Sequence, residues 1–196
     1  MRIVLLSAVL FGLMISAAAQ DFPKAEIFGG YSYGNFQVLS SRSSLNGWNA
    51  SATVNIYRWF GLTTDFGGLY GGKGSEVIVL PPPIGTETES LKEHSYTFLF
   101  GPQFAYRTGK LSGFGHLLFG ESRVNESGTV TCASCTGFIL VGRNSLTTAQ
   151  TTLALGVGGD YKLTRTMAWR VQVDYLPISS TNNLRVSTGL VFRVGK

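Results

Sequence analysis

The sequence predicts an all-β fold, an eight-stranded antiparallel up-and-down transmembrane β-barrel. Two observations carry this prediction: eight stretches alternate apolar and polar residues, and the connections between them alternate in length. The clearest stretch is residues 48–56, Trp48-Asn49-Ala50-Ser51-Ala52-Thr53-Val54-Asn55-Ile56, in which every even position is apolar. Because successive side chains of a strand point to opposite faces, this segment has one apolar and one polar face.

The first nineteen residues differ in character from the rest of the chain. Arg2 is followed by an apolar run from Ile3 to Ile15 and then by Ala17-Ala18-Ala19. A basic start, a short apolar core and small residues are typical of a secretory signal peptide, here cleaved before Gln20. The apolar run is shorter than the roughly 20 residues of a membrane helix. We therefore expect residues 1–19 to be removed and residues 20–196 to form one barrel domain.

The expected strands and their connections follow from the alternation and its interruptions. The strands are expected at residues 24–34, 46–57, 60–70, 94–107, 111–121, 149–162, 167–176 and 183–194. The short connections are then 58–59, 108–110 and 163–166, and the longer ones are 35–45, 71–93, 122–148 and 177–182. Outer-membrane barrels have short periplasmic turns, longer external loops and periplasmic termini. The four longer connections are therefore expected outside the cell.

Aromatic residues gather near the ends of the expected strands, which favours two girdles at the membrane surfaces. The outer girdle would contain Trp48, Tyr70, Tyr96 and Tyr175, and the periplasmic girdle Phe60, Tyr106, Phe114, Tyr161, Trp169 and Phe192. Aliphatic residues, such as Val171 and Val173 in the seventh strand, lie between the two.

The opposite faces of the same strands carry charge. We expect a network of ion pairs inside the barrel formed by Asp65, Arg107, Asp160, Arg170, Asp174, Arg185 and Arg193, with Gln103, Lys162 and Gln172 beside them. Charges can be buried there only if they are paired or wet, and an eight-stranded barrel is narrow enough for side chains to fill. This pattern favours a filled interior over an open pore.

Two local features complicate the pattern. Pro102 lies within a strand beside Gly101 and cannot donate a ladder hydrogen bond, so we expect a β-bulge there. The stretch 111–121 is apolar at both parities, and its faces are left unassigned.

The candidate chemical motifs are weak. Cys132 and Cys135, in the longest connection, have too few companions for a zinc site and are expected to form a loop disulfide. His94 and Ser95, beside Glu93, could suggest a lipid hydrolase, but neighbouring strand residues point to opposite faces. We expect no catalytic residues, no metal and no cofactor. The chain has 16 basic and 11 acidic residues. The basic residues form no run, which argues against nucleic-acid binding.

With these features together, the chain resembles the OmpA-like outer-membrane β-barrel family. The stretches 96–102, 155–161 and 183–193 carry the resemblance, which extends over essentially all of residues 20–196. It implies a monomer in the outer membrane of a Gram-negative bacterium, contacting lipid and inserted by the barrel-insertion machinery. The family's terminal aromatic has its counterpart in Phe192, four residues before the end, and we expect no peptidoglycan-binding domain.

These expectations favour a non-enzymatic structural or surface-interaction protein that presents its external loops. A narrow or gated, porin-like solute pore is the alternative, and mobile lumen charges would favour it. An outer-leaflet lipid hydrolase and a soluble lipocalin-like carrier, which needs the reverse polarity, are weaker alternatives.

Overall fold

The computed structural model describes residues 22–38, 41–71, 76–79, 86–133, 142–178 and 181–195. The expected signal peptide, residues 1–19, lies outside these ranges. The strands are β1 Ala25–Val38, β2 Ser41–Asn55, β3 Phe60–Gly71, β4 Glu76–Val79, β5 Thr86–Thr108, β6 Leu111–Ala133, β7 Gly142–Lys162, β8 Met167–Ile178 and β9 Thr181–Val194. Within the described residues no helix is long and apolar enough to cross a membrane.

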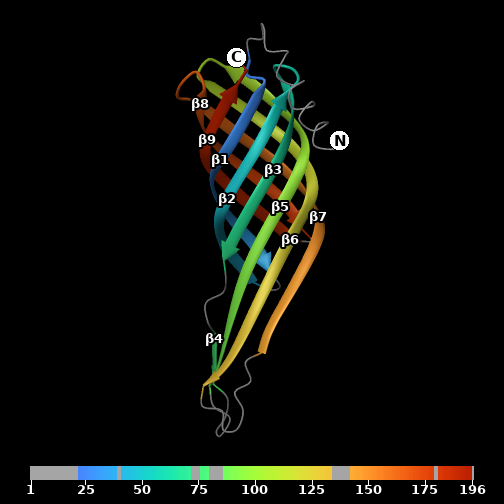
Figure 1. Ribbon diagram of the computed structural model, residues 1–196, viewed down its shortest axis with the longest axis vertical. Helices are drawn as coiled ribbons and strands as arrows, with labels where there is room; N and C mark the ends of the chain where they lie inside the picture. Colours follow the sequence, from blue (N-terminus) through green and yellow to red (C-terminus); the bar gives the residue numbers. More distant parts are fainter. Residues whose placement is uncertain are drawn as a thin grey trace, which may run out of the picture.

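Eight of these strands close into an antiparallel barrel, which confirms the predicted fold. The strand order is β3-β2-β1-β9-β8-β7-β6-β5, and pairing between β3 and β5 closes the ring. The remaining strand, β4, pairs with β5 beyond the closed part, from Glu76↔Glu89 to Val79↔Thr86. The described termini lie together at one end of the barrel, and β4 lies toward the other (Figure 1).

The turns at the end near the termini are short, as predicted. Gly109 and Lys110 alone connect β5 to β6, and Gly109 has a φ of 55°, a left-handed conformation that glycine adopts at little cost. Residues 56–59 connect β2 to β3, and residues 163–166 connect β7 to β8. These turns keep the strands that they connect close together at this end of the barrel.

The connections at the opposite end are shorter than predicted, because the strands continue into them. Strand β5 begins at Thr86 instead of residue 94, and β6 ends at Ala133 instead of residue 121. The predicted loops 71–93 and 122–148 are therefore largely β-sheet in their described parts. Strands β1, β2, β7 and β9 also extend into predicted connections, 35–45, 122–148 and 177–182.

The prediction of a β-bulge at Pro102 is wrong. Phe100 pairs with Phe119 and Gln103 pairs with His116, so both strands advance by three residues across this point. On the other side, Pro102 still pairs with Leu62 of β3. The register is thus unbroken although proline lacks an N–H, and no extra residue is needed.

Strand 111–121, whose faces the sequence left open, has a single consistent orientation. Phe114, His116 and Leu118 are buried, whereas Leu111 and Phe119 are exposed. Even-numbered residues of β6 therefore point into the barrel in this stretch. Burial of Phe114 contradicts its predicted place in the periplasmic aromatic girdle.

Candidate functional site: the charged interior

The interior near the termini contains a cluster of five charged side chains, each from a different strand. Arg170 of β8 contacts both acids: its Nη2 lies 3.0 Å from Glu26 Oε2, and its Nε lies 2.7 Å from Asp160 Oδ1. Arg107 Nη2 lies 3.0 Å from Glu26 Oε1, and Arg193 Nη2 lies 2.9 Å from Asp160 Oδ2. Three arginines thus share two carboxylates. We call this arrangement the lower cluster because it lies near the termini, at the end drawn uppermost in Figure 1.

Arg170 is the centre of the lower cluster, and aromatic rings help to hold it. Its guanidinium carbon lies 4.3 Å from the ring centroid of Phe114 and 5.6 Å from that of Phe28. A cation over an aromatic face is stabilised electrostatically, more so when it is desolvated. The inward orientation of Phe114 therefore gives this buried arginine a packing partner.

A second cluster, the upper cluster, lies farther from the termini. Arg185 Nη2 lies 2.8 Å from both Asp65 Oδ1 and Asp174 Oδ2. His116 Nε2 lies 2.8 Å from the other oxygen of Asp174. Arg185 also donates a hydrogen bond of 3.3 Å from Nη1 to Thr97 Oγ1. One arginine therefore links acids from β3 and β8, on different sides of the barrel.

Amides connect the upper cluster to the strands around it. Asn49 donates from Nδ2 to Asp65 at 2.8 Å, and Gln172 donates from Nε2 to Asn49 Oδ1 at 3.2 Å. Gln103 accepts a bond of 3.2 Å from Thr63, which is itself within 2.9 Å of Thr53. These bonds give the buried charges neutral neighbours and limit their movement.

Leucines fill the interior beyond the upper cluster. The apolar cluster consists of Leu45, Leu69, Leu99, Leu118, Ala154 and Leu176. On β8, Leu176 follows Asp174 in the inward row, and on β3, Leu69 follows Asp65 and Gly67. The interior therefore changes from charged to apolar along these strands toward the end opposite the termini.

All seven residues predicted for the lumen network lie in these two clusters. Sequence reasoning missed Glu26, which contacts Arg107 and Arg170 and is only 2% exposed. The sequence did contain a signal for it, because Glu26 stands beside the apolar Ile27 and neighbouring strand residues point to opposite faces. The buried Phe28 obscured it, since that makes the inward row of β1 look apolar. The contact between His116 and Asp174 was also not predicted.

Glycine makes room for the upper cluster. A Cβ built on Gly156 would collide with the His116 ring and with Asp174 Oδ1. The same atom built on Gly159 would meet only Ser112 O, at an ordinary 3.7 Å. Position 156 therefore has room only for glycine beside the His116–Asp174 ion pair.

Gly156→Ala should therefore destabilise the barrel by about 1–3 kcal/mol, the usual cost of forcing atoms into a packed interior. Urea unfolding in lipid vesicles, followed by tryptophan fluorescence, measures this. Gly159→Ala on the same strand is the control and should change the midpoint little. Equal midpoints for the two variants would show that the His116–Asp174 contact does not depend on Gly156.

The outer wall carries the aromatic residues. The eight predicted girdle residues that are exposed on it are Trp48, Tyr70, Tyr96, Tyr106, Tyr161, Trp169, Tyr175 and Phe192. Phe60 is half-buried. Aliphatic side chains such as Val171 and Val173 are exposed on the same wall. The exterior polarity is thus the reverse of that required by the soluble-carrier alternative.

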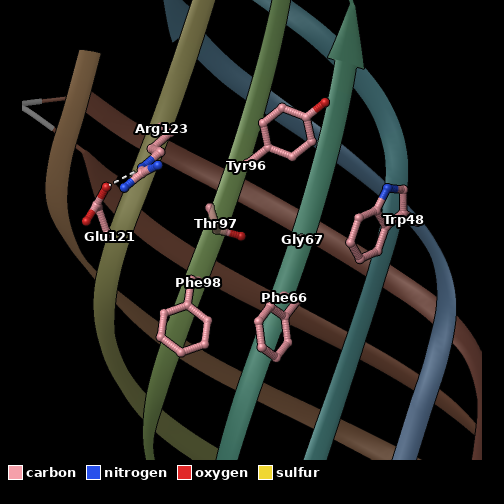
Figure 2. Close-up of a pocket in the computed structure, with 8 residues that line it drawn as sticks. All are labelled: Trp48, Phe66, Gly67, Tyr96, Thr97, Phe98, Glu121 and Arg123. Atoms are coloured by element: carbon pink, nitrogen blue, oxygen red, sulfur yellow. Dashed lines mark hydrogen bonds and ion pairs between the residues drawn. The ribbon is translucent and has the colours of Figure 1, made fainter. Parts of the chain in front are cut away.

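A hollow of about 390 Å³ lies on this wall, across β2, β3, β5 and β6 (Figure 2). Phe66 and Phe98 pack with ring centroids 4.8 Å apart, and Arg123 Nε lies 2.5 Å from Glu121 Oε1. Trp48 donates from Nε1 to Tyr70 O–H at 3.2 Å. Exposed rings beside an ion pair suit the boundary between lipid chains and headgroups.

The hydrolase motif is not assembled. His94 is exposed and packs edge-on against Tyr70, whereas Ser95 is buried. No group of three or more metal-ligating side chains occurs among the residues that the structure describes. The disulfide predicted between Cys132 and Cys135 lies outside the described side chains and stays a prediction.

A closed antiparallel barrel with an apolar aromatic exterior and paired charges inside defines a transmembrane β-barrel of the outer-membrane type. A family model described as the outer membrane protein beta-barrel domain matches residues 3–195, so the chain belongs to this family. The protein is accordingly located in the outer membrane of a Gram-negative bacterium, with its termini on the periplasmic side.

Solved structures have the same fold. Ail, the attachment invasion locus protein of Yersinia pestis, solved with the heparin analogue sucrose octasulfate, is 16% identical with a TM-score of 0.58, covering 86% of this chain and 97% of its own. Neisserial surface protein A is 9% identical with a TM-score of 0.59, covering 89% and 99%. OprG of Pseudomonas aeruginosa is 13% identical with a TM-score of 0.54, covering 91% and 99%. No curated protein sequence matches the chain.

Proposed function

We propose that this chain is a non-enzymatic surface-interaction protein, in which a closed barrel holds a β-sheet outside the membrane. The observation that carries the proposal is the unequal length of the strand pairings. Pairing of β5 with β6 continues to Thr86↔Ala133, and that of β6 with β7 continues to Val130↔Gly142. Pairing of β7 with β8 ends at Leu155↔Tyr175. Strands β4 to β7 consequently extend beyond the barrel (Figure 1).

The extended sheet has an unpaired edge on β7. Among the described residues, β7 has no ladder partner on its β8 side from Gly142 to Ala154. Pro177 of β8, which lacks an N–H, lies near this point and accepts a hydrogen bond from the Thr152 hydroxyl at 3.3 Å. An unpaired edge offers a row of backbone donors and acceptors to another chain.

The composition of this edge leaves it open to pairing. Residues 144–153 contain no charged residue and no proline, which are among the usual protections of an edge strand. Extended peptides bind such edges by adding a strand, and the backbone hydrogen bonds supply the affinity. We therefore propose an extended segment of a partner protein as the ligand of this edge.

The interior supports a closed barrel over the solute-pore alternative. Arg170 and Arg185 are each about 1% exposed and each contacts two carboxylates. Paired, desolvated charges with several partners are costly to separate. The apolar cluster adds packed aliphatic side chains that fill the lumen beyond the upper cluster. Both features favour a lumen whose role is to stabilise the barrel.

The likeness to Ail and Neisserial surface protein A supports a role at the cell surface, since both names describe surface or attachment proteins. At 9–16% identity the likeness concerns the fold, and neither ligand nor contact residue is carried over. The opposite placement of His94 and Ser95 supports a non-enzymatic role. A monomer inserted by the barrel-insertion machinery completes the proposal.

The test blocks the β7 edge without breaking the sheet. Lys162 N donates to Lys110 O, and Leu163 N donates to Met167 O. Because successive N–H groups of a strand point to opposite sides, odd-numbered β7 residues direct theirs toward the free edge. Ala149→Pro should remove one such donor and leave the β6 ladder intact. Ala149→Val, which keeps the donor, is the control.

Peptides from a phage-displayed library, selected on proteoliposomes of the wild-type protein, serve as probes. We expect Ala149→Pro to weaken their binding at least tenfold and Ala149→Val to change it less than twofold. Gel mobility without boiling verifies that both variants are folded. Peptides that bind Ala149→Pro as well as wild type, or a selection that finds none above empty liposomes, would contradict recognition through this edge.

A further inference from the structure

A polar hollow of about 190 Å³ opens at the periplasmic end of the barrel, separate from the outer sheet. Its four basic lining residues come from distant parts of the chain: Arg58 from the β2–β3 turn, Arg107 from the end of β5, Lys162 from the end of β7 and Arg193 from the end of β9. Barrel closure brings these residues together. We call this hollow the basic cup.

The basic cup has an excess of positive charge. None of the described residues that line it carries a carboxylate. The nearest acids in the network, Glu26 and Asp160, are held by arginines of the lower cluster. Arg107, Arg170 and Arg193 already outnumber these two acids, and Arg58 adds a further cation to the lining, so the potential in the cup is positive.

Arg193 provides an independent indication of a missing partner. Its side chain is only 8% exposed, and its Nε has no hydrogen-bond acceptor among the described residues. The Glu26 carboxylate oxygen lies 3.7 Å away, beyond hydrogen-bond distance. Buried polar groups nearly always have a partner. An acceptor placed in the cup would supply one.

The other polar groups of the cup are suited to an oxyanion. Thr108 and Ser112 contribute hydroxyl groups from the two sides of the β5–β6 turn. Guanidinium groups bind the oxygens of phosphate with two parallel N–H donors, and lysine adds a point charge. We infer that the basic cup is a binding site for a phosphate group, either on a soluble phosphate compound or on a phospholipid headgroup of the periplasmic leaflet.

The experiment titrates the refolded protein in neutral detergent with inorganic phosphate at constant ionic strength. Arginine Nε–H resonances are followed by NMR in protein labelled with ¹⁵N-arginine. We expect a saturable shift of the Arg193 resonance. Arg58→Gln with Lys162→Gln should weaken phosphate binding at least tenfold, and neither change touches Arg193 directly.

Lys110→Gln with Arg165→Gln is the matched control, because it removes the same charge from the same end of the barrel outside the cup. Phosphate affinity should change less than twofold in this control. An absent or unsaturable shift, or equal weakening in both pairs, would overturn the proposal and leave only a diffuse surface charge. Unboiled gel mobility verifies the fold of all variants.

Lipid nanodiscs then identify the source of the phosphate group. If phosphatidylglycerol, added to phosphatidylcholine, lowers the apparent phosphate affinity at least tenfold, a lipid headgroup occupies the basic cup. If the affinity is unchanged, the ligand is a soluble phosphate compound. Either outcome supports the site and assigns its ligand.

Discussion

Arg185→Leu is expected to destabilise the barrel by about 3–5 kcal/mol, the range for removing one partner of a buried ion pair. Arg185 is 1% exposed and is 2.8 Å from both Asp65 and Asp174. Without it, two carboxylates remain inside the barrel with no arginine between them. Equilibrium unfolding by urea in vesicles of fixed composition measures the loss.

A compensated variant separates charge from packing in this prediction. Arg185→Leu combined with Asp65→Asn and Asp174→Asn removes the unpaired charges together with the arginine. We expect this triple variant to recover most of the stability, since the large cost of breaking a buried ion pair comes from the charge left without a partner. A triple variant as unstable as Arg185→Leu alone would assign the loss to packing instead.

Val171→Arg is expected to cost about 2–4 kcal/mol, or to prevent insertion, because it places a charge on the lipid-facing wall. Val171 is 38% exposed and lies between Trp169 and Tyr175 on β8. Folding yield in vesicles, read from the unboiled gel band, measures the effect.

Val194→Arg is the control for this substitution, since Val194 is exposed on the same wall but ends β9. Near the membrane surface the cost falls to about 0–1 kcal/mol. Equal yields for Val171→Arg and Val194→Arg would place Val171 outside the hydrocarbon layer.

The sequence predicts the barrel well where its two faces meet different surroundings. In β8, Trp169, Val171 and Val173 face outward, while Arg170 and Gln172 face inward, and the alternation is unambiguous. It fails at residues 86–93 and 122–133, where the strands leave the barrel. Segments such as Thr-Glu-Thr-Glu carry no apolar face, so backbone pairing forms these strands without a periodic signal.

The interior was predictable in composition and less so in contacts. Alternation identifies Arg170 and Asp160 as inward-facing, but it cannot show that Glu26 of β1 meets Arg170 of β8, with β9 between the two strands. That contact depends on the register with which the barrel closes. Phe114 was misplaced for a related reason, because β6 is apolar on both faces and only its pairing with β7 fixes which residues point inward.

The most direct test of the closed interior is the conductance of the wild-type protein in a planar lipid bilayer. The lower, upper and apolar clusters predict no discrete channel openings after the protein is inserted. Unboiled gel mobility verifies that the inserted protein is folded. Regular openings of uniform size in the wild-type protein would contradict the closed barrel and favour the solute pore.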